Sequence, residues 1–301
     1  MKLPLPYRAA LFLLLLPAST LHADDFLPGA KRILFLGDSI TYSGEYVDRF
    51  EVFVRKTYPE RHFEIINCGL PSETVSGLSE DGHAGGQFPR PDLHERLERV
   101  LAKVKPDLVF ACYGMNDGIY LPFDEDRFAK YQDGIQRLHA AVTKAGAKII
   151  HLTPPVFDPG PGQDRAASYD AVLARYSAWL LEQRAVGWQV IDFHEPMSQA
   201  LDARRKADPA FVFAGDHVHP NEAGQLVLAD ALIEGLRPDR IGVFRKAVIE
   251  KTYVDKVRQR GRILTDAWLT DTGHKRPGMA KGLPMAEAIE KAAVLEKELE
   301  K

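Results

Sequence analysis

Two segments of this chain contain the residue types that acyl transfer requires. Ser39 follows the apolar run RILFL and the dipeptide Gly37-Asp38, and Asp216 and His219 lie three residues apart in DHVHP. A serine hydroxyl is a poor nucleophile until a base removes its proton, and the imidazole pKa suits that task near neutral pH. A carboxylate can hold the imidazole in the required tautomer. The residue types therefore allow a serine–histidine–aspartate site.

Acyl transfer also needs hydrogen-bond donors around the oxyanion, and losing one such donor costs on the order of 3 kcal/mol. The candidate donors are the backbone N–H of Ser39, the backbone N–H of Gly69 in NCG and the side-chain amide of Asn116 in GMND. Glycine lets the backbone come close to a ligand, and an amide donates without carrying a charge. We expect Ser39, Gly69 and Asn116 to form the oxyanion hole.

Three residues of these segments have other interpretations that must be weighed. Ser39 alone could be the cap of the next helix, because Ser and Asp are common at that position. Asp38 is expected to brace the turn, since a carboxylate beside the nucleophile would disfavour the developing oxyanion. His217 competes with His219 as the base, although PNEAG after His219 resembles a helix start. The ordered set of segments, not any one residue, favours catalysis.

The elements that must position these residues follow from hydrophobic patterning. Short runs rich in Ile, Val, Leu and Phe predict strands over residues 32–36, 63–67, 108–111, 148–153 and 189–192. Helical patterns cover residues 46–57, 93–104, 127–145, 166–184 and 221–235. This alternation predicts a doubly wound parallel α/β sheet with right-handed crossovers. Ligands bind at the carboxyl ends of such strands, so we expect the polar segments to meet there.

Composition limits the classes of partner. The 301 residues are 45% hydrophobic and 27% charged, which is typical of a soluble globular chain with one large core. A formal charge of −3 is too small to indicate nucleic-acid binding or electrostatic attachment to a membrane. The expected partner is a small-molecule or polysaccharide substrate.

The first 23 residues differ from the rest. Lys2 and Arg8 precede an apolar run over residues 9–16, and a polar stretch ends at Ala23. This pattern predicts a secretory signal peptide. The apolar run is well below the roughly 20 residues that a membrane span needs. We expect cleavage near Ala23, no stable membrane insertion and a periplasmic or extracellular location.

Two segments do not fit a minimal domain. Residues 78–92 form a Gly- and Pro-rich loop, which could be a functional wall, with His83 and GGQF lining the pocket, or a mobile excursion. Residues 237–301 read as a helical extension, with a basic helical stretch over 245–262 and a final helix over 285–301. Within it, Trp268 and the run 274–276 either cover the mouth of the site, bind an acidic sugar or lie on a solvated surface.

The blocks GDSI, NCG, GMND and DHVH, in this order and approximate spacing, resemble those of the GDSL-type or SGNH hydrolases, which use Ser, Gly, Asn and His. The resemblance covers roughly residues 31–236, which we expect to belong to a hydrolase domain over residues 24–236. Ile40 replaces the leucine of GDSL, and this exchange of one aliphatic side chain for another leaves the chemistry intact.

The resemblance implies a flavodoxin-like three-layer α/β/α sandwich with a five-stranded parallel sheet, and no metal or organic cofactor. It implies Ser39 as the nucleophile, His219 as the general base and Asp216 as the residue that orients it. Gly69 and Asn116 would complete an oxyanion hole begun by Ser39.

The resemblance also bears on the two cysteines, because the family's strand order places the first strand between the second and the third. Cys68 and Cys112 would then lie about two strand spacings of ~4.8 Å apart. A disulfide requires Cα atoms within about 7 Å, so this strand order implies two free, buried thiols.

These observations lead to one functional hypothesis and its rivals. We expect an exported serine esterase, a carboxylic ester hydrolase that deacetylates a carbohydrate through an acyl-enzyme on Ser39. A lysophospholipase or thioesterase of the same fold is the alternative within the enzyme class. A non-catalytic carbohydrate-binding protein is the alternative outside it.

Overall fold

The computed structural model describes residues 27–248 and 250–299, so the predicted signal peptide over residues 1–23 lies outside the described residues. At its centre is one parallel five-stranded sheet with the order β2-β1-β3-β4-β5. The strands are β1 (Arg32–Gly37), β2 (Glu64–Asn67), β3 (Leu108–Cys112), β4 (Lys148–Leu152) and β5 (Gln189–Ile191). All five predicted strands are confirmed to within one residue at each end.

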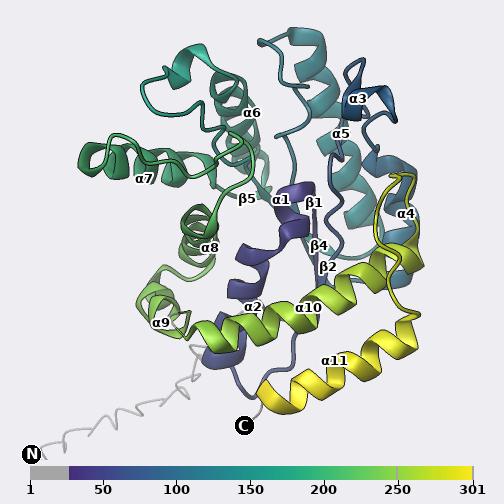
Figure 1. Cartoon of the computed structure of the whole chain (residues 1–301). Helices are drawn as coiled ribbons and strands as arrows, with labels where there is room; N and C mark the ends of the chain where they lie inside the picture. Colours follow the sequence, from purple (N-terminus) through teal and green to yellow (C-terminus); the bar gives the residue numbers. More distant parts are fainter. Residues whose placement is uncertain (1–26, 249, 300–301) are drawn as a thin grey trace, which may run out of the picture.

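Eleven α-helices are present among the described residues. They are α1 (Ser39–Ser43), α2 (Glu45–Thr57), α3 (His83–Gly86), α4 (Leu93–Val104), α5 (Glu125–Lys144), α6 (Asp170–Glu182), α7 (His194–Ala207), α8 (Glu222–Leu236), α9 (Ile241–Ala247), α10 (Lys251–Thr272) and α11 (Met285–Leu299). Helix α2 packs with α8, and α4 with α5. Tyr131 of α5 stacks on Tyr176 of α6 with ring centroids 4.3 Å apart. The expected α/β sandwich is therefore confirmed (Figure 1).

The order of the strands explains where a ligand site belongs. From β1 the chain crosses to β2 on one side, and then returns past β1 to β3 on the other side. The direction of winding reverses at β1, and such a switch point opens a crevice at the carboxyl ends of the strands. Ser39 begins the short helix α1 directly after β1, so the fold places it at this switch point.

The core encloses β1, whose residues from Ile33 to Leu36 have no exposed surface. Phe35 stacks on Phe110 of β3 with ring centroids 4.8 Å apart, and Phe50 of α2 packs edge-on against Phe35 at 5.5 Å. A strand buried on both faces reads as a continuous apolar run, as RILFL does. This packing fixes the strand that ends two residues before Ser39.

The loop after β2 is held to the turn after β3 by the buried side chain of Asp117. Its carboxylate accepts hydrogen bonds from the backbone N–H groups of Val75 (2.9 Å) and Ser76 (2.8 Å). Gly134 of α5 lies against the same loop, where a Cβ atom would overlap the Val75 carbonyl oxygen. The loop that follows NCG and the GMND segment are thus fixed relative to each other.

The C-terminal helices pack against the sheet domain. Helix α10 runs beside α2 and the edge strand β2, and α11 packs along α10 (Figure 1). The Glu296 carboxylate of α11 binds Arg55 of α2 at 2.5 and 2.9 Å and Arg260 of α10 at 2.6 Å. Charged pairs as well as contacts between helices thus join the extension to the domain.

Two predicted helices differ from the observed elements. The stretch over 245–262 is not a single helix, because α9 ends at Ala247 and α10 begins at Lys251. The predicted helix over 166–184 is too long, because a short 3-10 turn at Arg165–Ala167 precedes α6.

Cys68 and Cys112 are free and buried on either side of β1, which confirms the expectation of two unpaired thiols. Across residues 27–248 and 250–299, no helix combines the length and the apolar character needed to span a membrane.

The packing of Gly134 gives a first prediction. Gly134→Ala should destabilise the protein by roughly 1–3 kcal/mol, because the added methyl group overpacks against the Val75 carbonyl. Helix propensity alone predicts the opposite sign, a gain of about 1 kcal/mol. Thermal and urea unfolding measure the difference.

Gly242→Ala is the matched control. Gly242 lies in α9, and no neighbouring group lies within 4 Å of the point that its Cβ would occupy, so this variant should be neutral or slightly more stable. Equal effects of the two substitutions would contradict the close approach at Gly134.

Candidate active site

A chain of hydrogen bonds joins the GDSI and DHVH segments. His219 Nε2 lies 2.8 Å from Ser39 Oγ, and His219 Nδ1 lies 2.6 Å from Asp216 Oδ2. A carboxylate can only accept, so Nδ1 carries the imidazole proton and Nε2 accepts the proton of the Ser39 hydroxyl. The Asp216 carboxylate also accepts the backbone N–H of His219 at 2.8 Å. The turn before α8 thus brings the Asp216 carboxylate into contact with both the backbone and the ring of His219.

The hydrogen bonds to Asp216 determine its charge. Partial burial alone would raise the pKa of Asp216, but hydrogen bonds from His219 and from the backbone N–H groups of His219 and Val218 lower it to about 2. Asp216 is therefore ionised at neutral pH, as a carboxylate that orients an imidazole must be.

The structure separates the two histidines of DHVH. His217 Nδ1 donates to the backbone carbonyl of Asp158 at 2.7 Å, and the His217 backbone has a φ of 72°. The left-handed conformation turns its ring toward the Asp158 loop, while the ring of His219 faces Ser39. The structure thus brings the ring of His219, and not that of His217, to Ser39.

Asp38, not Ser39, is the helix cap. Its side chain accepts the backbone N–H of Ile40 at 2.9 Å and is the N-cap of α1. Burial raises the pKa of Asp38 to about 7, and the nearby carboxylate of Asp117 adds to the increase. Because Asp38 caps the helix, the hydroxyl of Ser39 is not needed as a cap and faces His219.

The expectation that Gly69 donates to an oxyanion does not fit the geometry. Its backbone N–H donates to Asn67 Oδ1 at 2.8 Å and is therefore already used. A Cβ atom at Gly69 would collide with the backbone N of Tyr42. Gly69 is needed because the α1 backbone passes directly over it.

A free backbone donor occurs three residues later, at Ser72. Among the described residues nothing accepts the Ser72 N–H, and the φ of this residue is 67°, a left-handed conformation that is uncommon outside glycine. Arg90 Nη1 contacts both the Ser72 carbonyl (3.5 Å) and Asn116 Oδ1 (2.9 Å), so this turn borders the Asn116 side chain. The sequence gives no signal for this residue, because a serine replaces the glycine that such a turn favours.

Asn116 is buried and keeps one amide hydrogen available. Its Nδ2 donates one hydrogen to the Glu73 carbonyl at 3.1 Å, and its Oδ1 accepts from Arg90 and from the Tyr120 hydroxyl. Glu73 is itself fixed by the buried Arg96, at 2.6 Å, and by the Tyr113 hydroxyl, at 2.7 Å. The amide is thus held on every side but one.

The C-terminal extension reaches the neighbourhood of α1. The Arg262 guanidinium lies 4.0 Å from the centre of the Tyr42 ring, one helical turn after Ser39, and Arg276 lies 5.4 Å from the Phe88 ring. Trp268 does not share this position, because it packs near Arg32 at the start of β1. Of the two candidate covers in the extension, only the segment around Arg276 lies toward the 78–92 loop.

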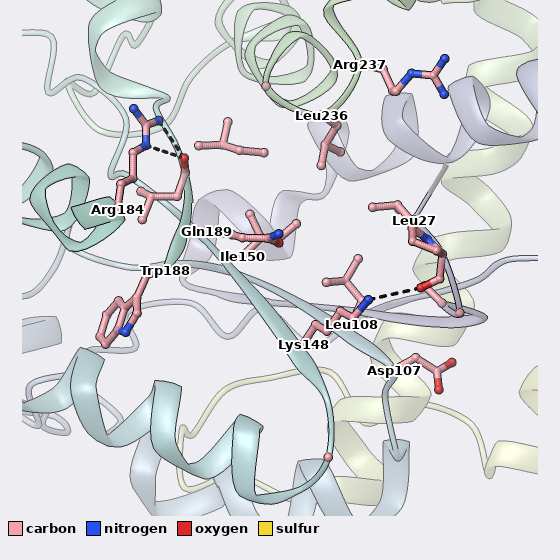
Figure 2. A pocket seen from close by; sticks show the side chains of 17 residues that line it. Leu27, Asp107, Leu108, Lys148, Ile150, Arg184, Trp188, Gln189, Leu236 and Arg237 are labelled. Atoms are coloured by element: carbon pink, nitrogen blue, oxygen red, sulfur yellow. Dashed lines mark hydrogen bonds between the residues drawn. The ribbon is translucent and has the colours of Figure 1, made fainter. Parts of the chain in front are cut away.

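A cavity of about 790 Å³ lies at the opposite end of the sheet (Figure 2). It is lined by the first residues of β3, β4 and β5, and its Lys148 and Arg184 side chains bind backbone carbonyls of Pro28 and Val190. In parallel sheets, ligands bind at the carboxyl ends of the strands, and this cavity is at their amino ends. It offers no nucleophile beside a base.

The buried position of Asp38 gives a prediction for pH dependence. An Asp in the unfolded chain loses its proton near pH 4, whereas Asp38 in the folded protein loses it near pH 7. Between these values the folded state binds more protons, so this group makes stability fall as pH rises and the loss is complete above about pH 7. Asp38→Asn keeps the acceptor for Ile40 and cannot ionise.

We therefore expect Asp38→Asn to raise Tm by several degrees at pH 8 and to leave it unchanged at pH 4, as measured by calorimetry. The same difference in Tm at both pH values would show that the Asp38 pKa is not raised by burial.

Comparison with known proteins places this chain in a family. Residues 35–227 match the GDSL-like Lipase/Acylhydrolase family. An acetylxylan esterase of Geobacillus stearothermophilus is 26% identical over 223 residues, which cover 67% of this chain and 92% of that protein. The crystal structure of an acetylxylan esterase from the same organism superposes with a TM-score of 0.55 at 23% identity, covering 69% of this chain and 94% of that one.

A gut microbial diltiazem-metabolizing enzyme shares the fold, with a TM-score of 0.52 at 20% identity. The match covers 69% of the present chain and 47% of that larger one. The family match covers more than half of the chain and includes the segments that contain Ser39, Asn116 and His219. The chain belongs to the GDSL-like lipase/acylhydrolase family and is an ester-bond hydrolase.

Proposed function

We propose that the protein is an exported serine esterase that removes acetyl groups from a carbohydrate through an acyl-enzyme on Ser39. The observation that carries the proposal is the hydrogen-bond chain from Ser39 Oγ to His219 Nε2, and from His219 Nδ1 to Asp216. In this arrangement a nucleophile, a base and an orienting carboxylate stand in the order that acyl transfer uses.

In the first half-reaction, Ser39 Oγ attacks the carbonyl carbon of the ester and its proton passes to His219 Nε2. The carbonyl oxygen becomes an oxyanion in a tetrahedral intermediate, and Asp216 stabilises the imidazolium that has formed. Collapse of the intermediate breaks the bond to the alcohol oxygen, which takes the proton from His219. The alcohol leaves, and the acyl group stays on Ser39.

In the second half-reaction, a water molecule takes the place of the alcohol. His219 Nε2 removes a proton from this water, which attacks the acyl carbon of the ester on Ser39. The second tetrahedral intermediate collapses, Ser39 recovers its proton from His219, and the carboxylic acid leaves. No cofactor takes part in these two half-reactions.

The donors that we assign to the oxyanion are the backbone N–H groups of Ser39 and Ser72 and the free amide hydrogen of Asn116. Two observations support this set. Asn116 donates only one of its amide hydrogens within the described chain, to the Glu73 carbonyl, and the Ser72 N–H has no partner in the described part of the chain. Gly69 is left out because Asn67 uses its N–H.

The substrate and the location are part of the same proposal. The acetylxylan esterase relative favours an acetylated polysaccharide or oligosaccharide. The basic and apolar start of the sequence favours a signal peptide over residues 1–23 and export to the periplasm or beyond. We assign residues 24–236 to the hydrolase domain and 237–301 to the helical extension.

Labelling with a fluorophosphonate tests the catalytic assignment. The wild-type protein should be labelled at Ser39, and Ser39→Ala should not react. Asp216→Asn should lower kcat on p-nitrophenyl acetate by about 10²–10⁴-fold, because an amide no longer fixes the proton on Nδ1. Peptide mass spectrometry locates the label. Wild-type protein that stays unlabelled beside a reactive control hydrolase would favour the non-catalytic alternative.

A substrate panel tests the choice of acyl group and alcohol. We expect higher kcat/KM on acetylated xylo-oligosaccharides than on lysophospholipids or acyl thioesters, and falling kcat/KM along p-nitrophenyl esters from acetate to longer chains. Released acetate and p-nitrophenol provide the measurements. A preference for long acyl chains would contradict the acetylesterase proposal and support the lysophospholipase alternative.

A further inference from the structure

We infer that Arg90 and Tyr120 are positioning residues that together hold the Asn116 amide with one N–H directed toward the oxyanion. The inference rests on the proposed function and assigns a role to the 78–92 loop, which is to deliver Arg90 to the active site.

Both side chains donate to the same atom. Arg90 Nη1 lies 2.9 Å from Asn116 Oδ1, and the Tyr120 hydroxyl lies 3.0 Å from it. The Arg90 guanidinium also lies over the Tyr120 ring, 5.3 Å from its centroid. Burial raises the pKa of Tyr120, so its hydroxyl keeps the proton that it donates. The carbonyl side of the amide therefore has two donors, one of them charged.

These contacts allow only one orientation of the amide. A guanidinium has donors and no acceptor, so the atom facing Arg90 must be the oxygen. The opposite face then presents Nδ2, which donates to the Glu73 carbonyl at 3.1 Å. A flipped amide would place two donors together at Arg90 and two carbonyl oxygens together at Glu73. Arg90 thus excludes the orientation in which Asn116 would turn an oxygen toward the oxyanion.

Arg90 is built into the loop rather than resting on the surface. Its Nε and Nη2 atoms make a paired interaction with the Glu80 carboxylate, each at 2.6 Å, and the residue is only 8% exposed. The backbone N–H of Arg90 donates to Ser79 Oγ at 2.9 Å. Partial burial alone would raise the pKa of Glu80, but the hydrogen bonds and positive charge of Arg90, together with a backbone N–H and His83, lower it. The ion pair between Arg90 and Glu80 therefore joins the two ends of the loop, and Arg90 Nη1 remains available to Asn116.

Tyr120 is held in place by unusual backbone geometry. Ile119 and Tyr120 have φ angles of 48° and 57°, and a β-branched residue such as Ile is rarely found in the left-handed region. Residues in such conformations persist when the surroundings impose them, and they cluster at functional sites. This turn brings the Tyr120 hydroxyl back to the side chain of Asn116, four residues earlier.

Holding the amide affects the transition state more than the bound substrate. The carbonyl oxygen of the ester gains its negative charge only as Ser39 attacks, so an oriented and polarised N–H stabilises the intermediate selectively. Hydrogen bonds to the amide oxygen strengthen the donor at the other end of the same group. Loss of either partner should lower kcat and leave KM nearly unchanged.

The experiment measures kcat and KM of the full chain on p-nitrophenyl acetate for Tyr120→Phe, Arg90→Met and Arg90→Lys. We expect kcat to fall about 3–10-fold for Tyr120→Phe and about 10–100-fold for Arg90→Met, with partial recovery in Arg90→Lys. The pH profile of kcat/KM should keep its shape, because Ser39 and His219 are untouched. Arg137→Gln, at an exposed arginine of α5 that pairs with Asp133, is the matched control and should leave kcat unchanged.

The decisive comparison is made in the Asn116→Ala background. If Arg90 and Tyr120 act through Asn116, their substitutions should change kcat by less than about 2-fold once the amide is gone. Losses of the same size in both backgrounds, or a KM effect without a kcat effect, would overturn the inference. Tyr120→Phe removes a single hydroxyl, so it decides the question even if circular dichroism shows that Arg90→Met does not fold.

Failure of the proposed function is distinguishable from failure of this inference. A wild-type protein that neither turns over p-nitrophenyl acetate nor reacts with a fluorophosphonate overturns both. A wild-type protein that is active, with Arg90→Met and Tyr120→Phe as active as wild type, overturns only the roles of Arg90 and Tyr120.

Discussion

The hydrogen bond between Ser39 Oγ and His219 Nε2 joins residues 180 positions apart, so it depends on nearly the whole sheet domain being folded. Ser39 is fixed by β1, which is buried between β2 and β3, and by the N-cap interaction of Asp38 with Ile40. His219 is fixed by the turn before α8, which packs against α2. Helix α1 begins at Ser39 and leads directly into α2, and α8 begins three residues after His219, so the contact between α2 and α8 helps to hold Ser39 and His219 together.

The two sides of the site differ in their surroundings. On the side where we propose that the oxyanion binds, Asn116 and Asp38 are each 3% exposed, and the fully buried Asp117 ties two loops together. On the side of the proposed base, the side chains of His219 and Asp216 are 50% and 57% exposed. Oriented donors stabilise charge best when they need not reorganise, which a buried network provides. The proposed base, in contrast, must meet a departing alcohol and then water, and an open position admits both.

Elements with local signals could be predicted from the sequence, whereas contacts between distant segments could not. The apolar runs located all five strands, and helix α4 was predicted with its bounds of 93–104. At Gly69 the absence of a side chain predicts the close approach of another group, but the group that approaches is the backbone of Tyr42 and not a ligand oxyanion. The contact between Arg90 and Asn116 spans 26 residues and two loops, and no periodic pattern encodes it. In these cases tertiary structure overrides local preference.

The extension is joined to the sheet domain by packing as well as by sequence. Phe244, Val254 and Val257 are at most 3% exposed and belong to the same hydrophobic core as the strands. Full burial of one such side chain contributes about 1.5–3 kcal/mol, so this interface is comparable with the net stability of a domain. Helix α10 also lies along β2, whose outer edge would otherwise present unpaired backbone groups. Since Arg262 of that helix lies against Tyr42, the packing that covers the sheet edge also borders the helix that begins at Ser39, the proposed nucleophile.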